Sequence, residues 1–79
     1  MEELKLADYL EEDVEDAEIS QWYKKPGELF SAEEAVLEIL IGKSETEICL
    51  GKAGKLEEII CEEGEIVGIN DPIAKISQV

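Results

Sequence analysis

The segment ISQWYKKPGELFSAEEAVLEI, residues 19–39, is matched by a second segment further along the chain, LEEIICEEGEIVGINDPIAKI, residues 56–76. The two segments begin 37 positions apart, and this shift places Gly27-Glu28 on Gly64-Glu65. The apolar positions that coincide are Ile19 with Leu56, Trp22 with Ile59, Leu29 with Ile66, Val36 with Ile73, and Ile39 with Ile76. The agreement of apolar positions and turn residues predicts two structurally similar halves.

Apolar residues occur in short runs separated by turn residues, which is typical of β-strands rather than helices. We expect strands at Leu4 to Leu6, Glu18 to Tyr23, Leu29 to Phe30, Ala35 to Ile41, Glu45 to Leu50, Lys55 to Cys61, Ile66 to Val67, and Ile73 to Ser77. The turn signals between them are Pro26-Gly27, Gly42-Lys43, Gly51 to Gly54, Glu63-Gly64, and Asn70-Asp71-Pro72. Ser31 and Glu34 resemble a capping box, so a single turn could precede the strand at Ala35.

Each half of this kind leaves one apolar face uncovered, and packing the halves together buries both faces. The expected fold is therefore all-β: a flattened antiparallel β-barrel or sandwich of two four-stranded halves with pseudo-twofold symmetry. Trp22 is expected in the shared core. Under the 37-residue shift, Lys43 corresponds to position 80, one past the last residue of the chain. The Lys43 turn and the chain termini are therefore expected at equivalent places at opposite ends of the molecule.

The Gly42-Lys43 pair is expected to form a two-residue hairpin loop between strands that end at Ile41 and restart at Ser44. Glycine at the first central position is what a type II′ turn requires, because that position has φ > 0. The turn would hold Lys43 outward. From local sequence alone, such a lysine is ordinarily a solubility residue. A phosphate-binding loop is excluded, because Leu37 stands where that motif needs glycine.

Length and charge narrow the classes of function. A chain of 79 residues forms one domain, 1–79, and its net charge of −14 argues against binding to nucleic acid or to an anionic membrane. No run approaches the roughly 20 apolar residues that cross a bilayer.

The N-terminus is acidic where a secretory signal is basic, so we expect a cytoplasmic protein. Cys49 and Cys61 could pair in a disulfide, but a reducing compartment favours two free thiols. The chain has no histidine, so no metal site is expected.

Three segments carry a resemblance that covers almost the whole chain: ISQWYKKPGELF (19–30), EILIGKSETEI (38–48) and AGKLEEIICEEGEIVGINDPIAKI (53–76). In order and spacing they resemble the biotinyl/lipoyl attachment domain family, most closely the lipoyl domains of the dihydrolipoyl acyltransferases in 2-oxoacid dehydrogenase complexes. Lys43 falls on the position of the modified lysine. The tip residues Gly42 and Ser44 stand where lipoyl domains usually have aspartate and alanine, and biotin carriers usually have methionines.

The resemblance implies a non-catalytic carrier domain, monomeric by itself, with lipoic acid attached covalently to Lys43. Its implied partners are a lipoate-protein ligase, a thiamin-diphosphate-dependent 2-oxoacid decarboxylase, an acyltransferase domain and a dihydrolipoyl dehydrogenase. Such a lipoyl-lysine shuttles acyl groups and reducing equivalents between their active sites. Glu45 and Glu47 are candidates for partner recognition. A biotin carrier domain and an unmodified lipoyl-like interaction module remain alternatives.

Overall fold

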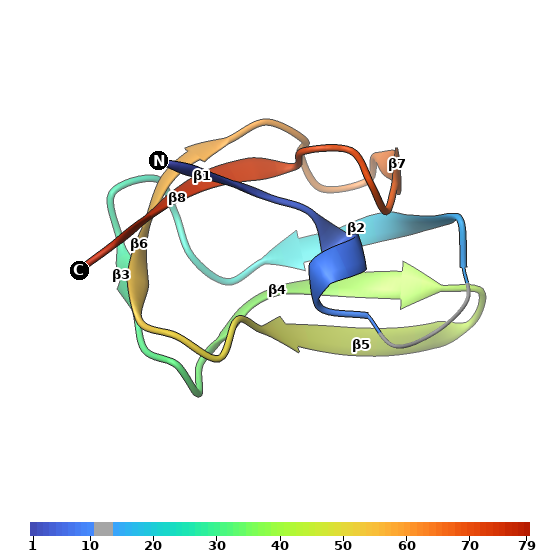
Figure 1. Cartoon of the computed structure of the whole chain (residues 1–79). Coiled ribbons are helices and arrows are strands. Elements are labelled where there is room, and N and C mark those ends of the chain that lie inside the picture. The colour runs from blue at the N-terminus through green and yellow to red at the C-terminus, as the bar shows by residue number, and fades with distance from the viewer. Residues whose placement is uncertain (11–13) are drawn as a thin grey trace.

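The computed structural model describes residues 1–10 and 14–79. These residues form strands and one short 3₁₀ helix (Figure 1). The elements are β1 (Glu2–Leu4), η1 (Leu6–Asp8), β2 (Asp16–Trp22), β3 (Leu29–Phe30), β4 (Ala35–Ile41), β5 (Ser44–Cys49), β6 (Gly54–Ile59), β7 (Ile66–Gly68) and β8 (Ala74–Gln78). Two four-stranded antiparallel sheets result, ordered β1-β8-β6-β3 and β5-β4-β2-β7. With overall extents of 33 × 21 × 18 Å, the molecule is a flattened sandwich, which confirms the expected all-β fold.

A pseudo-twofold relation exchanges the two sheets. The 37-residue shift carries β2 onto β6, β3 onto β7 and β4 onto β8, and β1 and β5 occupy equivalent edges. The sheets differ from the sequence halves, because β3 pairs with β6 and β7 pairs with β2. Each half therefore contributes an edge strand to the sheet of the other, which ties the halves together.

The symmetry extends to individual hydrogen bonds. The pairing shifts register just after Ile19 in β2 and just after Leu56 in β6, so both halves carry the same irregularity. The Gly64 N–H donates to the Ile19 carbonyl, and the Gly27 N–H donates to the Leu56 carbonyl, each at 2.7 Å. The turn of each half is thus held by the central strand of the other half.

The core lies between the sheets and contains only apolar side chains among the described residues. Its members are Leu4, Leu6, Ala17, Ile19, Phe30, Val36, Leu37, Ile39, Ile48, Leu50, Leu56, Val67, Ile73, Ala74 and Ile76. Most of them alternate along their strands with polar residues that are partly buried or exposed, as expected for a sheet with one solvated face. Within the described residues, the structure contains no helical segment with the length and apolar character that a bilayer crossing requires.

Trp22 lies at the edge of this core instead of inside it. Its side chain is only partly buried and packs against the core. The indole Nε1–H donates to the Cys61 carbonyl at 3.0 Å. This contact explains the position, because a tryptophan needs a partner for its N–H and finds one at the edge of the sandwich.

The N-terminal segment differs from the predicted strand at Leu4 to Leu6. The strand β1 ends at Leu4, and Leu6 begins η1 while remaining fully buried. The Ala7 N–H donates to the Ile69 carbonyl at 2.8 Å, so the chain turns there to cover the core. Strand β6 likewise ends at Ile59, two residues before the predicted end at Cys61.

The turn expected near Ser31 is present. The Ser31 N–H donates to the Glu34 carboxylate at 2.8 Å, and the Glu34 N–H donates to the Ser31 carbonyl at 3.2 Å. These bonds close one turn before β4 begins at Ala35.

Candidate functional site: the β4–β5 hairpin

The β4–β5 hairpin closes with the two-residue loop that the sequence predicts. Ile41 and Ser44 are register partners, and Gly42 and Lys43 lie between them. Gly42 has φ +64°, while no non-glycine among the described residues has positive φ. A positive φ at the first central position only is the signature of a type II′ turn.

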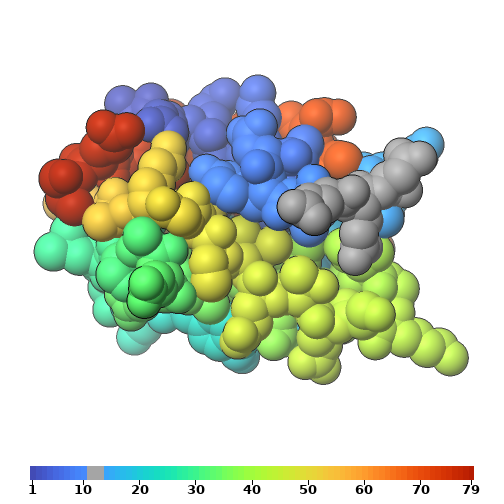
Figure 2. All heavy atoms as spheres, turned by 60° about the horizontal axis from the view of Figure 1, so that its bottom comes forward, coloured from blue at the N-terminus to red at the C-terminus, as the bar shows by residue number. Residues whose placement is uncertain are grey.

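Lys43 is exposed at the tip of this hairpin. In both views the hairpin forms one end of the molecule, and the chain termini lie towards the other (Figures 1 and 2). Figure 2 shows yellow-green atoms of the hairpin extending away from the body of the molecule. The expected arrangement of the Lys43 turn and the termini at opposite ends is therefore confirmed.

The other lysines are mostly engaged or partly buried. Lys24 pairs with Glu34 at 3.0 Å, Lys52 with Glu2 at 2.7 Å, and Lys55 with Glu57 at 4.0 Å. Lys5 and Lys75 are partly buried, and Lys25 is exposed in the loop after β2. Lys43 and Lys25 are thus the two lysines whose residues are exposed, and Lys43 differs from Lys25 in lying at a projecting hairpin tip.

The outer face of the hairpin is acidic. Glu45 and Glu47, the predicted recognition residues, are both exposed on β5. Glu47 is the register partner of Glu38 on β4. The Tyr23 hydroxyl lies between them, 3.1 Å from a Glu38 carboxylate oxygen and 3.2 Å from one of Glu47.

The Tyr23 hydroxyl has one proton and faces two carboxylates. A hydrogen bond with Gln21 lowers the pKa of Tyr23, but desolvation and the carboxylates of Glu38 and Glu47 outweigh it, so the pKa is raised overall. Sequence analysis did not place Glu38 or Tyr23 in this cluster. The outward alternation along β4 could have located Glu38, whereas Tyr23 follows β2 and reaches the cluster only through tertiary pairing.

A small pocket of about 190 Å³ adjoins the hairpin. Its lining residues are Asp16, Ala17, Glu18, Leu40, Gly42 and Ile66. Ile66 is 71% exposed although it is apolar. Sequence analysis did not bring Ile66 to this place, because the pairing of β7 with β2 is what puts it there.

The two cysteines are free thiols, as expected. Cys49 is exposed on β5, whereas Cys61 is partly buried, and desolvation raises the pKa of its thiol. In the part of the chain that the structure describes, no group of three or more acidic or cysteine side chains is arranged to hold a metal ion.

The hairpin presents an amine that another protein can acylate, and it does not resemble a catalytic centre. A Cβ at Gly42 would meet no atom within 4 Å, so the space beside the tip is open. An enzyme that modifies Lys43 would therefore meet little steric hindrance from the neighbouring backbone.

Comparisons with known proteins agree on one family. The biotin/lipoyl family model, described as biotin-requiring enzyme, matches residues 3–76. The chain is similar to the dihydrolipoyllysine-residue succinyltransferase component of the 2-oxoglutarate dehydrogenase complex from Bartonella vinsonii subsp. berkhoffii, with 39% identity over 77% of this chain and 15% of that protein. The corresponding Bacillus subtilis component is 31% identical over 99% of this chain and 18% of its own length. The chain therefore spans less than a fifth of these relatives.

A solved structure is similar over nearly the whole chain. It is the lipoyl domain of the 2-oxoglutarate dehydrogenase complex from Azotobacter vinelandii, with a TM-score of 0.77 and 26% sequence identity. The match covers 96% of this chain and 95% of that one.

Proposed function

The chain belongs to the biotinyl/lipoyl attachment domain family, and from this premise we propose that it is a lipoyl carrier domain of a 2-oxoacid dehydrogenase complex. Lys43 carries lipoic acid through an amide bond, and the domain moves acyl groups and reducing equivalents between active sites. The observation that supports this most is the exposed Lys43 amine at the tip of a type II′ hairpin, within a lipoyl-domain fold.

The residues around the tip fit such a group. Gly42 has no side chain, and a Cβ atom at this position would meet no other atom within 4 Å. The Lys43 ammonium has no ion-pair partner among the described residues. When bound, lipoic acid supplies a dithiolane that takes up an acyl group on reduction and is later reoxidised. The chain supplies the attachment point and the orientation, while a tether gives the arm a high effective concentration at successive sites.

The domain itself is a carrier, not an enzyme. The succinyltransferase and acetyltransferase relatives match only over 15–18% of their lengths, and the matching solved structure is a lipoyl domain. We assign the chemistry to its partners: a 2-oxoacid decarboxylase that loads the arm, an acyltransferase domain that unloads it, and a dihydrolipoyl dehydrogenase. A lipoate-protein ligase installs the group.

Partner recognition is assigned to the acidic outer face of the hairpin. Glu45 and Glu47 are exposed on β5 directly after the modified lysine, and Glu38 lies opposite Glu47. Complementary charge speeds encounter and rejects wrong partners more than it adds affinity. A partner that presents a basic surface around its active-site entrance would therefore be selected by these carboxylates.

Intact-mass measurement after incubation with a lipoate ligase tests the proposal. The wild-type chain should gain one lipoyl group, Lys43→Arg should gain none, and Lys25→Arg should behave as wild type. The Lys25 variant is the matched control, because Lys25 is the other exposed lysine. Modification of Lys43 by a biotin ligase instead would establish a biotin carrier, and no modification by either ligase would favour an unmodified interaction module.

A further inference from the structure

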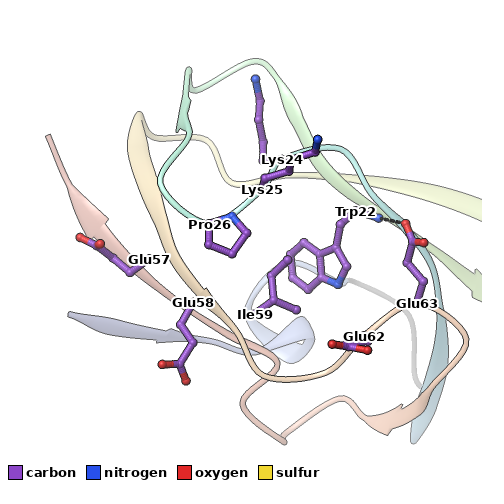
Figure 3. Close-up of a pocket in the computed structure, with 9 residues that line it drawn as sticks. All are labelled: Trp22, Lys24, Lys25, Pro26, Glu57, Glu58, Ile59, Glu62 and Glu63. Atoms are coloured by element: carbon purple, nitrogen blue, oxygen red, sulfur yellow. Dashed lines mark hydrogen bonds between the residues drawn. The ribbon is translucent and has the colours of Figure 1, made fainter.

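A larger groove lies away from the hairpin. Its volume is about 630 Å³, within the roughly 300–1,000 Å³ typical of ligand sites. The residues that line it are Trp22, Lys24, Lys25, Pro26, Glu57, Glu58, Ile59, Glu62 and Glu63 (Figure 3). Trp22 is the last residue of β2, whereas the pocket beside Gly42 adjoins the first residues of that strand, so the two sites are separate.

Part of the groove lining is apolar. Trp22, Pro26 and Ile59 contribute its apolar surface. Two hydrogen bonds hold Trp22: its Nε1–H donates to the Cys61 carbonyl at 3.0 Å, and its backbone N–H donates to the Glu63 carboxylate at 2.9 Å. Figure 3 shows the second bond as a dashed line. A fixed, partly exposed tryptophan is a frequent anchor in protein interfaces, because it buries a large area with little loss of side-chain freedom.

The two walls of the groove differ in charge. The pseudo-twofold relation equates Trp22 with Ile59 and Lys25 with Glu62, so the groove lies across the symmetry axis with opposite charges on its two sides. Lys24 is engaged by Glu34, which leaves Lys25 as the exposed cation. The opposite wall carries four glutamates.

Two of these glutamates are available to a ligand. Among the residues that the structure describes, the carboxylates of Glu58 and Glu62 make no hydrogen bond and no ion pair, and both residues are exposed. By contrast, Glu57 accepts a hydrogen bond from Ser77, and Glu63 accepts one from Trp22. A groove whose lining residues include free carboxylates and an indole suits an arginine or lysine side chain, which both kinds of group attract.

We propose that this groove docks an extended basic segment of a partner protein, in which an arginine or lysine next to an apolar residue occupies the groove. The apolar residue packs on Trp22 and Ile59, and the cation pairs with Glu58 and Glu62. The net charge of −14 disfavours a second copy of this chain as the occupant and favours a basic partner. The proposal does not depend on the modification of Lys43.

Trp22 is the single tryptophan of the chain, so its fluorescence reports on the groove directly. The probe is a capped eight-residue peptide that alternates arginine with valine, and the control peptide has glutamine in place of each arginine. Peptide is added to ¹⁵N-labelled protein while tryptophan fluorescence and amide shifts are recorded. We expect saturable binding of the arginine peptide, with the largest shifts at the Trp22 indole N–H, Ile59 and Glu62, and no saturable binding of the glutamine peptide.

Two double variants distinguish binding in the groove from nonspecific attraction by the net negative charge of the chain. Glu58→Gln/Glu62→Gln should weaken binding roughly threefold to tenfold, as expected for two exposed ion pairs. Glu3→Gln/Glu33→Gln removes the same charge at exposed positions outside the groove and should leave affinity within about twofold. The proposal is overturned if no binding occurs up to millimolar peptide, if both double variants bind equally, or if the shifts centre on β4 and β5.

Discussion

Phe30 of β3 lies against Gly54 of β6, and the two residues are partners in the antiparallel register. A Cβ at position 54 would lie 2.8 Å from the Phe30 Cζ and 2.7 Å from the Ser77 carbonyl oxygen. At the pseudo-symmetric place in the other half, Ala17 pairs with Val67. Position 54 is thus restricted by two neighbours, the Phe30 ring and the Ser77 carbonyl, whereas the equivalent position 17 accepts a methyl group opposite the smaller Val67.

This relationship predicts non-additive effects on stability. Gly54→Ala should lower the free energy of unfolding by about 1–3 kcal/mol through overpacking. Phe30→Val/Gly54→Ala copies the Ala17–Val67 pair, so its loss should be smaller than the sum of the two single losses, although contact with the Ser77 carbonyl remains. Urea unfolding of the four proteins measures the coupling. Strictly additive losses would show that the Phe30 ring does not restrict position 54.

The tip substitutions should have opposite effects on stability and on modification. Gly42→Asp places a side chain at φ +64°, which should cost roughly 1 kcal/mol of unfolding free energy even though the space is open. Ser44 is exposed, so Ser44→Ala should change the free energy of unfolding by no more than about 0.5 kcal/mol. The double variant restores the usual lipoyl tip, and we expect a lipoate ligase to modify it faster than wild type. An unchanged rate would mean that the ligase recognises the hairpin geometry, not its side chains.

The two thiols should react at different rates in the native state. Desolvation, followed by the charges of Glu65 and Asp71, raises the pKa of Cys61, so less thiolate is present at any given pH, and the thiolate is the reactive form. Cys49 is exposed and should be labelled first near pH 7.5. The rate at Cys61 should rise with pH through a midpoint above that of the same thiol in the unfolded chain, where both cysteines react. Equal native rates at the two sites would contradict this.

The Ser31–Glu34 turn should make stability depend on acid pH. The hydrogen bond from the Ser31 backbone N–H, followed by Lys24, lowers the pKa of Glu34 below its ordinary 4.5. Because the folded-state pKa is depressed, this contribution is present above the unfolded pKa and is lost as pH falls through the folded pKa. Glu34→Gln should therefore be less stable than wild type near pH 7, and the difference should shrink as the pH falls below 4.5. Glu33→Gln, at the exposed neighbouring position, should show no such trend.

The repeated pattern of the sequence was enough to predict most of the fold. Turn glycines such as Gly27 and Gly64 and the alternation around Ile39 locate strands, since both reflect local backbone conformation and one buried face. The hairpin at Lys43 was predictable for the same reason. Leu6 was not, because its 3₁₀ turn depends on covering a core built by distant strands.

The surroundings of the candidate site were only partly predictable. Glu47 could be assigned to the exposed face of a strand, but its approach to Tyr23 depends on the order β5-β4-β2 across the sheet. The groove at Trp22 also requires tertiary structure, because its walls come from the ends of β2 and β6 and from the loops that follow these two strands. Pairings between distant strands are therefore the information that local patterns lacked.

Acyl loading of the modified domain tests the carrier function most directly. The lipoylated chain is incubated with a thiamin-diphosphate-dependent decarboxylase for 2-oxoglutarate or for pyruvate, together with its 2-oxoacid, and its intact mass is measured. We predict that the domain lipoylated at Lys43 gains one acyl group from one of these enzymes, while Lys43→Arg, treated identically, gains none. Failure of the lipoylated domain to accept an acyl group from either enzyme, or acylation of Lys43→Arg, would contradict the assignment of Lys43 as the carrier residue.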